Sequence, residues 1–488
     1  MNIFSYNFFV LWIACAVLYY TIARKHQWLL LLSMSLIFYL YSITKVPVVL
    51  LFVSLLTYAG AVWITNARKH ERKQPEKTVQ RVKWLIAVTC IIVLIANSTT
   101  KWFFMLGNSY FTLKAISYLY DVERDERNCE RNFLFYLLYL IYLPTILQGP
   151  FNRFVQFREN IADRIQFDYT GFMHGIQRFL WGAFKKLVLA ARLEQIGTYV
   201  SGSWESQSGI SIIIGIVAYS LWFYMDFSGY MDMMIGVSGT FGVVLPENFR
   251  QPYFSKSTAE FWRRWHITLG GVFRDYIMMP FIQSGTGRKL RKYFKKYSKT
   301  AGKLAPVLVG TFLVWSATAL WHGLTWNYLI WGMYYCAIIS SSLVLEGAYS
   351  KIKKRFRISE NTKWYGVFCM VRTWCILLGA NMILQVNDFS EFGVIIRQLV
   401  GRSFWIGGYG SLEALGWIKQ DAVVLLIGLL MVLLMSAAKE KNVDVFEVVD
   451  RQVLPIRWIV YYILFFAVLL FGMYGSKYDA GQFLYMQF

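Results

Sequence analysis

Charged side chains are scarce in this sequence of 488 residues, in which Asp, Glu, Lys and Arg together account for only 16%. A soluble globular domain typically carries about 25% of these residues. Hydrophobic residues reach 57%, and several apolar runs approach the ~20 residues that cross a bilayer as a helix. The lack of charge therefore excludes an ordinary soluble protein and predicts an all-α polytopic membrane protein.

Motifs that bind metals or phosphates, or that form disulfides, are also missing. The six cysteines have neither disulfide nor metal-ligand spacing, and most of them lie in apolar runs, where cysteine behaves as a small hydrophobic residue. The glycines form no phosphate-binding loop, and the sequence has no Ser-His-Asp motif and no zinc-ligand cluster. We therefore expect no bound metal and no bound cofactor.

Positive charge is in excess, with a formal net charge of +22, and basic residues gather in three short blocks beside apolar runs. The blocks comprise Arg68, Lys69, Arg72, Lys73, Lys77, Arg81 and Lys83, then Arg288, Lys289, Arg291, Lys292, Lys295, Lys296, Lys299 and Lys303, then Lys351, Lys353, Lys354, Arg355 and Arg357. This pattern is typical of cytoplasmic loops and indicates topology rather than nucleic-acid binding. Anionic lipid headgroups are a secondary expected partner.

The apolar runs predict membrane spans at 4–22, 27–43, 46–65, 84–99, 102–120, 132–148, 172–193, 209–236, 305–321, 325–346, 364–384, 421–438 and 457–474. With the basic blocks and residues 24–26 in the cytoplasm, the loop 385–420 and both termini lie outside. Residues 3–20 have no basic n-region and no small-residue cleavage site, so we interpret them as a retained first span. Residues 1–488 are interpreted as one membrane domain.

The segment 256–281 is different, because its pattern is amphipathic. Aromatic and aliphatic residues recur on one side at helical spacing, and Arg263, His266, Gly270 and Arg274 recur on another. We expect a helix that lies along the membrane interface or lines a wet cavity. His266 would belong either to a basic interfacial face or to a channel that guides an anionic donor.

Of the five histidines, His322 is the most unusual, because it closes an apolar run and another apolar run follows at once. An ionisable group in a membrane segment is costly, and it normally faces a cavity or a partner. An imidazole there can take a proton from a hydroxyl and return it to a leaving group. The alternative is a neutral histidine that only hydrogen-bonds between helices.

Two carboxylates, Asp226 and Asp232, lie six residues apart in the otherwise apolar span 209–236. They are too far apart around a helix to form a simple acid–base pair. Hydrogen bonding between helices explains them as well as catalysis does.

Several motifs, in this order and at this spacing, resemble the membrane-bound O-acyltransferase family over roughly residues 100–346. They are Asp226-Phe-Ser-Gly-Tyr-Met-Asp232, Glu247-Asn-Phe-Arg-Gln-Pro-Tyr253, Phe261-Trp-Arg-Arg-Trp-His266-Ile-Thr-Leu269, Arg274-Asp-Tyr276 and Leu320-Trp-His322-Gly323, with support from Gly107-Asn-Ser-Tyr-Phe-Thr112, Ile116-Ser-Tyr-Leu-Tyr-Asp121 and Gln148-Gly-Pro150. The resemblance is to the bacterial branch that acts on alginate and teichoic acid.

The resemblance implies a ring of about 11–13 helices around a central tunnel, with interfacial or re-entrant helices and C-terminal spans over 364–474. It implies an O-acyltransferase of the bacterial plasma membrane, with His322 and His266 as catalytic residues. Arg263, Arg274, Asp226, Asn248 and Trp321 would bind substrate or hold the cavity wall. The donor would be acetyl-CoA or a carrier-protein thioester on the cytoplasmic side. A polysaccharide acceptor and an extracytoplasmic transferase partner would lie on the other side.

Two departures from the alginate branch leave the acyl group open. A Gly-Gly-Asn-Arg turn is replaced by Pro280-Phe-Ile-Gln-Ser-Gly-Thr-Gly287 and a basic insertion, and a Phe-Arg pair is missing around Ile383-Leu-Gln-Val386. D-alanyl transfer to teichoic acid is therefore an alternative to acetyl transfer. The alternative from another class is a transporter or flippase of a lipid-linked or anionic substrate, although no internal repeat supports it.

Overall fold

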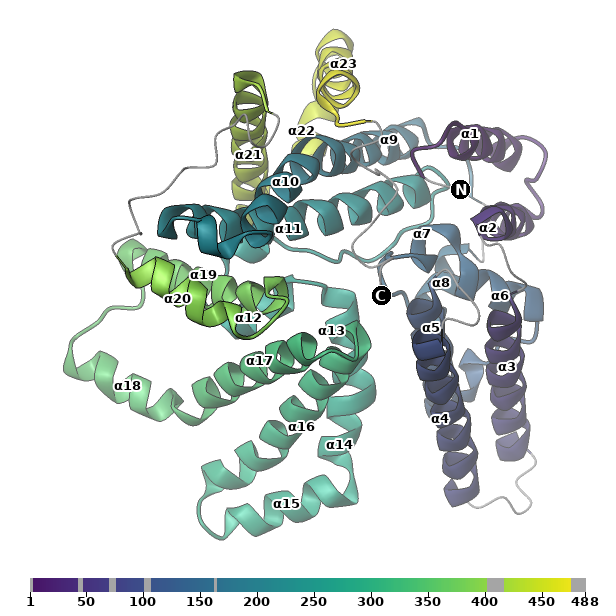
Figure 1. Cartoon of the computed structure of the whole chain (residues 1–488). Coiled ribbons are helices and arrows are strands. Elements are labelled where there is room, and N and C mark those ends of the chain that lie inside the picture. Colours follow the sequence, from purple (N-terminus) through teal and green to yellow (C-terminus); the bar gives the residue numbers. More distant parts are fainter. Residues whose placement is uncertain are drawn as a thin grey trace.

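The computed structural model describes residues 3–42, 47–69, 76–100, 107–161, 165–401 and 417–474, and most of these residues are helical (Figure 1). No β-strand occurs within these ranges, where the β-type pairing is a single antiparallel bridge between Phe249 and Trp265. The predicted all-α polytopic class is confirmed. His70 lies outside the described residues, as do Arg72 and Lys73 of the first basic block, residues 402–416 of the loop 385–420 and residues 475–488.

The N-terminal helices form one side of the molecule in Figure 1. They are α1 (Tyr6–Tyr20), α2 (Gln27–Ser42), α3 (Val48–Lys69), α4 (Glu76–Thr100), α5 (Asn108–Arg124), α6 (Phe133–Ile141), α7 (Leu143–Ile146) and α8 (Phe154–Ile161). The predicted span 132–148 is wrong as a single helix, because it breaks at Tyr142 between α6 and α7. Pro144 follows at the start of α7 and has no backbone N–H to continue the ladder of α6.

The central helices α9 (Tyr169–Ala183), α10 (Ala191–Ser201) and α11 (Gly209–Gly239) connect this side to the rest (Figure 1). Between α9 and α10 the chain continues as a π-helix, η2, over Phe184–Ala190. The remaining helices are α12 (Thr258–Arg264), α13 (Ile267–Phe273), a π-helical turn η5 (Arg274–Met278), α14 (Met279–Gln283), α15 (Gly285–Lys295), α16 (Lys299–His322), α17 (Trp326–Val344), α18 (Glu346–Arg355), α19 (Lys363–Gln385), α20 (Glu391–Val400), α21 (Lys419–Glu440), α22 (Val445–Asp450) and α23 (Leu454–Phe471).

Within the described ranges, seven helices are long and apolar enough to cross a membrane, namely α3, α4, α11, α16, α19, α21 and α23. The pair α17 and α18, bent by 59°, makes an eighth if it counts as one span. The number of helices that meet this length and composition is lower than the 11–13 helices expected in the ring. α1 and α2 have only 15 and 16 residues, and α5 buries Lys114 and Asp121. α1 and α2 keep exposed apolar side chains such as Ile13 and Ile37, so they fall short of a full span by length and not by burial.

The segment 256–281 is not the continuous amphipathic helix that its periodicity predicts. The chain breaks between α12 and α13 at His266, whose backbone is left-handed with φ of 45°. The break is held by pairing with a distant segment, since the N–H of Arg250 donates to the carbonyl of Arg264 (2.9 Å) and the N–H of Ile267 donates to that of Asn248 (3.0 Å). The predicted polar stripe is therefore split into two differently oriented helices.

Buried ion pairs join η2 and α9 to α11. The ammonium of Lys186 pairs with Asp226, and that of Lys185 pairs with Asp232 at 2.6 Å. Arg178 of α9 also contacts Asp232, at 3.0 Å. The two lysines interrupt an otherwise apolar stretch, and a buried charge without a counter-charge is strongly destabilising. The carboxylates thus fix the rotation of α11 against α9 and η2.

Glycines allow the same helices to approach closely. A Cβ atom at Gly182 of α9 would lie 2.4 Å from the carbonyl oxygen of Gly229 in α11, and one at Gly236 would lie 2.5 Å from the carbonyl oxygen of Gly175. Small residues at helix contacts are the usual way for membrane helices to gain packing. Backbone atoms meet here, so larger side chains cannot be accommodated by a rotamer change.

The substitution Gly182→Ala should lower the unfolding temperature of the detergent-solubilised protein. Its methyl group would press on backbone atoms of α11, and overpacking of this kind costs about 1–3 kcal/mol. Gly347→Ala in α18 is the matched control, because a Cβ there meets nothing within 4 Å. Alanine favours a helix over glycine, so the control should be neutral or slightly stabilising. Equal unfolding temperatures for the two variants would contradict the close α9–α11 contact.

Candidate active site

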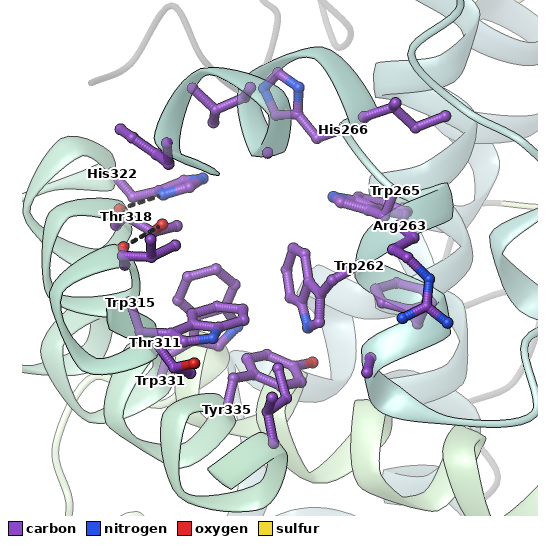
Figure 2. Close-up of a pocket in the computed structure, with 18 of the residues that line it drawn as sticks. Trp262, Arg263, Trp265, His266, Thr311, Trp315, Thr318, His322, Trp331 and Tyr335 are labelled. Carbon is purple, nitrogen blue, oxygen red and sulfur yellow. Dashed lines mark hydrogen bonds between the residues drawn. The ribbon is translucent and has the colours of Figure 1, made fainter. Parts of the chain in front are cut away.

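A cavity of about 520 Å³ lies between α12 and α13 on one wall and α16 and α17 on the other, with α11 and α19 closing the remainder. Figure 2 shows both predicted histidines on its walls, His266 from the start of α13 and His322 from the end of α16. Both are largely buried, with exposed fractions of 4% and 7%. The structure therefore brings together two residues that are 56 positions apart in the sequence.

His322 is held by its own helix. Its Nδ1 lies 2.7 Å from the carbonyl oxygen of Thr318, and a carbonyl can only accept, so Nδ1–H donates. In the neutral ring, Nε2 then carries the lone pair, and Figure 2 places the ring with its second nitrogen toward the cavity. The imidazole is thus oriented to accept a proton from a molecule inside the cavity.

The residue after His322 has to be glycine. Gly323 ends α16 with φ of 156°, and a Cβ there would lie 2.8 Å from Cδ2 of Tyr328. The ring of Tyr328 stacks against His322 with centroids 5.8 Å apart, and that of Trp331 meets it edge-on at 5.3 Å. The Trp-His-Gly sequence therefore ends the helix where aromatic rings of α17 fix the imidazole.

Asn248 lies behind the wall, next to His266. Its Oδ1 accepts from the backbone N–H of Thr268 (3.1 Å), from the Thr268 hydroxyl (2.8 Å) and from Nδ1 of His266 (3.2 Å). The backbone N–H can only donate, which identifies this amide atom as the oxygen and makes Nδ1 of His266 a donor. The amide Nδ2 contacts the sulfur of Met231 in α11 at 3.4 Å. Asn248 thereby links the histidine to α11 and does not line the cavity.

Trp321 connects the two histidines. Its ring centroid lies 4.9 Å from that of His322 and 6.2 Å from that of His266, and both contacts are edge-to-face. On its other side it meets Tyr110 of α5 at 5.5 Å. Trp321 is therefore a wall element between the histidines rather than part of the cavity lining.

The two predicted arginines are at the cavity edge. Arg263 lies beside Trp262 and Trp265 in Figure 2, and Arg274 lines both this cavity and a neighbouring one of about 160 Å³. Arg274 and Arg153 both form ion pairs with Asp275. Nε of Arg274 lies 2.8 Å from Oδ1 of Asp275. Burial tends to raise the pKa of Asp275, but hydrogen bonds from the two arginines and their charges bring it below its usual value. The side chain of Arg274 is 64% exposed, so part of its guanidinium faces open space.

Asp226 is not in the cavity. It is 1% exposed and pairs with Lys186, and Asp232 pairs with Lys185 and Arg178. Of the two interpretations of these carboxylates, hydrogen bonding between helices is the one that fits their contacts. Within the described residues, no group of three or more His, Cys, Asp or Glu side chains is placed to hold a metal ion.

Sequence reasoning missed the aromatic residues of the cavity. Trp262 meets Trp315 at 4.9 Å, Trp331 at 5.6 Å and Tyr335 at 4.9 Å between ring centroids, and Figure 2 shows these rings gathered away from His266. A signal was present, because Thr311, Trp315, Thr318 and His322 recur on one face of α16 at helical spacing. These walls give the cavity a largely apolar surface from which water is easily displaced.

The motif segments of the N-terminal part contact those of the cavity wall. The hydroxyl of Tyr276 donates to the carboxylate of Asp121, with both oxygens at 2.8 Å. Phe151, just after Gln148-Gly-Pro150, stacks on Tyr110 at 4.7 Å and on His266 at 6.3 Å. The motifs that lie far apart in the sequence thus form one continuous structure around His266.

Comparisons with known proteins relate this chain to a family and to several bacterial proteins. A model of the MBOAT, membrane-bound O-acyltransferase family, matches residues 122–386. The chain is 29% identical over 421 residues to a probable alginate O-acetylase of Pseudomonas fluorescens, covering 84% of this chain and 76% of the relative. It is 29% identical to a teichoic acid D-alanyltransferase of Bacillus subtilis, covering 55% of this chain and 65% of the relative. It is 28% identical to a peptidoglycan O-acetyltransferase of Helicobacter pylori, covering 52% of this chain and 49% of the relative. In the last two comparisons the match spans less than two thirds of the relative.

The substitution Asn248→Ala should lower both the unfolding temperature and the catalytic rate. It leaves the Thr268 donors and Nδ1–H of His266 without their acceptor, and each unsatisfied buried donor costs about 1–3 kcal/mol. Asn248→Asp keeps an oxygen at the Oδ1 position and should retain more activity than the alanine variant. Equal loss in both variants, measured as product formed by purified protein, would contradict the acceptor role of Asn248.

Proposed function

The chain belongs to the membrane-bound O-acyltransferase family, and on this premise we propose that it moves an acetyl group from a cytoplasmic thioester to a polysaccharide at the bacterial cell surface. The observation that carries this proposal is the orientation of His322, whose Nδ1–H is engaged by Thr318 while Nε2 faces an apolar cavity. The family and its multi-pass helices make the chain a membrane O-acyltransferase, which removes the transporter alternative.

In this reaction His322 is the general base. Nε2 takes the proton of the acceptor hydroxyl as the oxygen attacks the thioester carbonyl, and the tetrahedral intermediate then releases the thiolate. The imidazolium returns its proton to the thiolate, so that an ester and a thiol are the products. The Thr318 carbonyl stabilises the charged ring, because Nδ1–H keeps its hydrogen bond throughout. Holding both reactants in a cavity that excludes water supplies much of the rate.

His266, Arg263 and Arg274 orient the donor in this proposal. Acyl thioesters of coenzyme A and of carrier proteins both place a phosphate at the end of a long pantetheine arm, and arginine binds phosphate well. Arg274 lies eight residues beyond His266, or about 12 Å along a helix. A phosphate at the exposed part of Arg274 would therefore leave the arm long enough to carry the thioester to the histidines.

The two ends of α16 support the direction of transfer in this proposal. Lys299 and Lys303 of the second basic block lie at its start, and His322 is its last residue. His322 is nineteen positions after Lys303, a rise of about 28 Å, against a hydrocarbon core of about 30 Å. Basic residues favour the cytoplasmic side. This separation supports a donor that enters from the cytoplasm and an acceptor, or an extracytoplasmic transferase partner, that approaches His322 from the other side.

Acetyl is favoured over D-alanyl by the chemistry of the cavity. D-alanine carries an ammonium group, and none of the described residues that line the cavity is an aspartate or glutamate. D-alanyl transfer remains the second candidate, because the tryptophan rings of the cavity could attract the ammonium group of D-alanine. Mass spectrometry of the cell-surface polysaccharide, from cells with and without the gene, distinguishes the two groups by the mass added to the acceptor.

The substitution His322→Ala should abolish acyl transfer by purified protein without a comparable change in unfolding temperature. Loss of a general base costs a factor of about 10²–10⁴. His26→Gln is the matched control, because His26 is exposed in the turn between α1 and α2. Transfer at the native rate by His322→Ala would show that another group is the base.

The substitution Arg274→Gln should raise KM for the thioester donor by about tenfold, because a charge-assisted hydrogen bond of about 1.5–3 kcal/mol is lost. kcat should change less, since Arg274 contacts the donor far from the reacting carbonyl. Arg291→Gln on the exposed face of α15 is the control for a general loss of positive charge. An equal effect of the two substitutions on KM would place the donor phosphate elsewhere.

A further inference from the structure

Two adjoining cavities lie beneath α21, and neither histidine lines them. One is apolar, has a volume of about 200 Å³ and lies between α11, α19 and α21, with Trp374 and Leu433 in its walls. The other is polar, has a volume of about 50 Å³ and lies between α9, η2, α11 and the end of α21. The two share Tyr224, Gln251, Val432 and Ser436, so they form one cleft with an apolar and a polar half.

The change from apolar to polar follows one face of α21. Leu429, Val432, Ser436 and Lys439 all line the cleft, at spacings of three or four residues that place them on the same side of the helix. From Leu429 to Lys439 this face extends about 15 Å. Along that length it passes from leucine through a hydroxyl to an ammonium group, which is complementary in order to the acyl chain, the glycerol and the anionic phosphate of a phospholipid.

The polar half carries an excess of positive charge. Arg178, Lys185 and Lys439 line it together with Asp232 and Glu247, so three cations face two carboxylates. The carboxylates are engaged by the first two cations: Glu247 accepts from Arg178 at 2.6 and 2.7 Å, and Asp232 accepts from Arg178 and from Lys185. Lys439 lies over the ring of Phe446, 5.5 Å away, and its charge also acts on Asp232, which the other two cations already contact directly. With three cations and two carboxylates, the polar half as a whole keeps one net positive charge.

We propose that this cleft binds one anionic phospholipid, with the phosphodiester at Lys439 and Ser436 and an acyl chain in the apolar half. Leu433 lines the apolar half and is exposed, as are Leu426, Leu430 and Leu434 on the outward side of α21, so the apolar half adjoins the surface that would face hydrocarbon. A basic pocket between membrane helices on the cytoplasmic side suits an anionic headgroup. A free phosphate ion would use only the polar half and would leave the apolar half without an occupant.

Lys439 is also close in sequence to a contact with α12, which forms part of the wall of the cavity that holds the histidines. The next residue, Glu440, accepts two hydrogen bonds from Arg264 of α12, at 2.8 and 3.0 Å. The bound lipid would thus fill the space between α21 and the helices that carry the cavity wall. The proposal rests on the cleft alone and stands whatever acyl group the protein transfers.

The test is native mass spectrometry of the full-length protein, purified in detergent and incubated with dioleoyl phosphatidylglycerol or, separately, with dioleoyl phosphatidylcholine. Lys439→Ala should lower the amount of phosphatidylglycerol adduct by about fivefold, the effect of one lysine near an anionic lipid. Lys441→Ala is the matched control, since Lys441 is exposed at the same end of α21 and does not line the cleft. Leu433→Trp should fill the apolar half and lower the adducts of both lipids.

Competition separates a lipid from a small anion, with glycerol 1-phosphate as the probe. Glycerol 1-phosphate should leave the phosphatidylglycerol adduct in place, because it lacks the chain that the apolar half holds. Lys439→Gln, which keeps most of the side-chain length, serves if the alanine variant does not fold. The proposal would be overturned if the Lys439 and Lys441 variants carried equal amounts of phosphatidylglycerol adduct. It would also be overturned if glycerol 1-phosphate displaced the lipid completely.

Discussion

The ion pairs between η2 and α11 are the constraint on which the rest of the structure depends. Lys185 and Lys186 follow each other in a π-helix whose residues are all buried, and Asp226 and Asp232 of α11 meet them. In a bilayer a charge must either find a counter-charge or reach water, so two adjacent lysines leave α11 little choice of rotation. A π-helical segment is a common feature of functional regions, and here it turns both ammonium groups toward α11.

Because its rotation is fixed, α11 also fixes the position of residues in the candidate active site. Asp226 is followed by Phe227, whose ring meets His266 edge-on at 4.8 Å, and Met231 contacts the amide of Asn248. Asn248 in turn holds Nδ1 of His266 and the start of α13. The carboxylates therefore act on the cavity indirectly, from behind its wall. The glycine contacts of α9 and α11 hold the same helices at a fixed distance, so rotation and separation are both determined.

The sequence predicts well those features that depend on local patterns. The apolar run at 305–321 became α16, and the motif around His322 places it at the end of that helix. Features set by distant partners were not predictable in the same way. The break at His266 depends on pairing with residues 248–250, and helical periodicity alone favours a continuous helix there. The lysines of η2 stood in an expected span and carried no motif, although the resemblance already pointed to the aspartates that bind them. The break at Tyr142 could have been inferred from Pro144, since proline cannot continue a helical ladder.

The apolar cavity with arginines at its edge has an electrical consequence. In the proposed reaction the phosphates of the donor stay beside Arg274, and only a neutral acyl group reaches His322. The imidazole takes one proton and gives one proton back at the same place, so no net charge moves across the membrane. A transmembrane voltage does work of about 2.3 kcal/mol per 100 mV on each charge that crosses. Here it does none, and the energy of the transfer comes from the thioester bond alone.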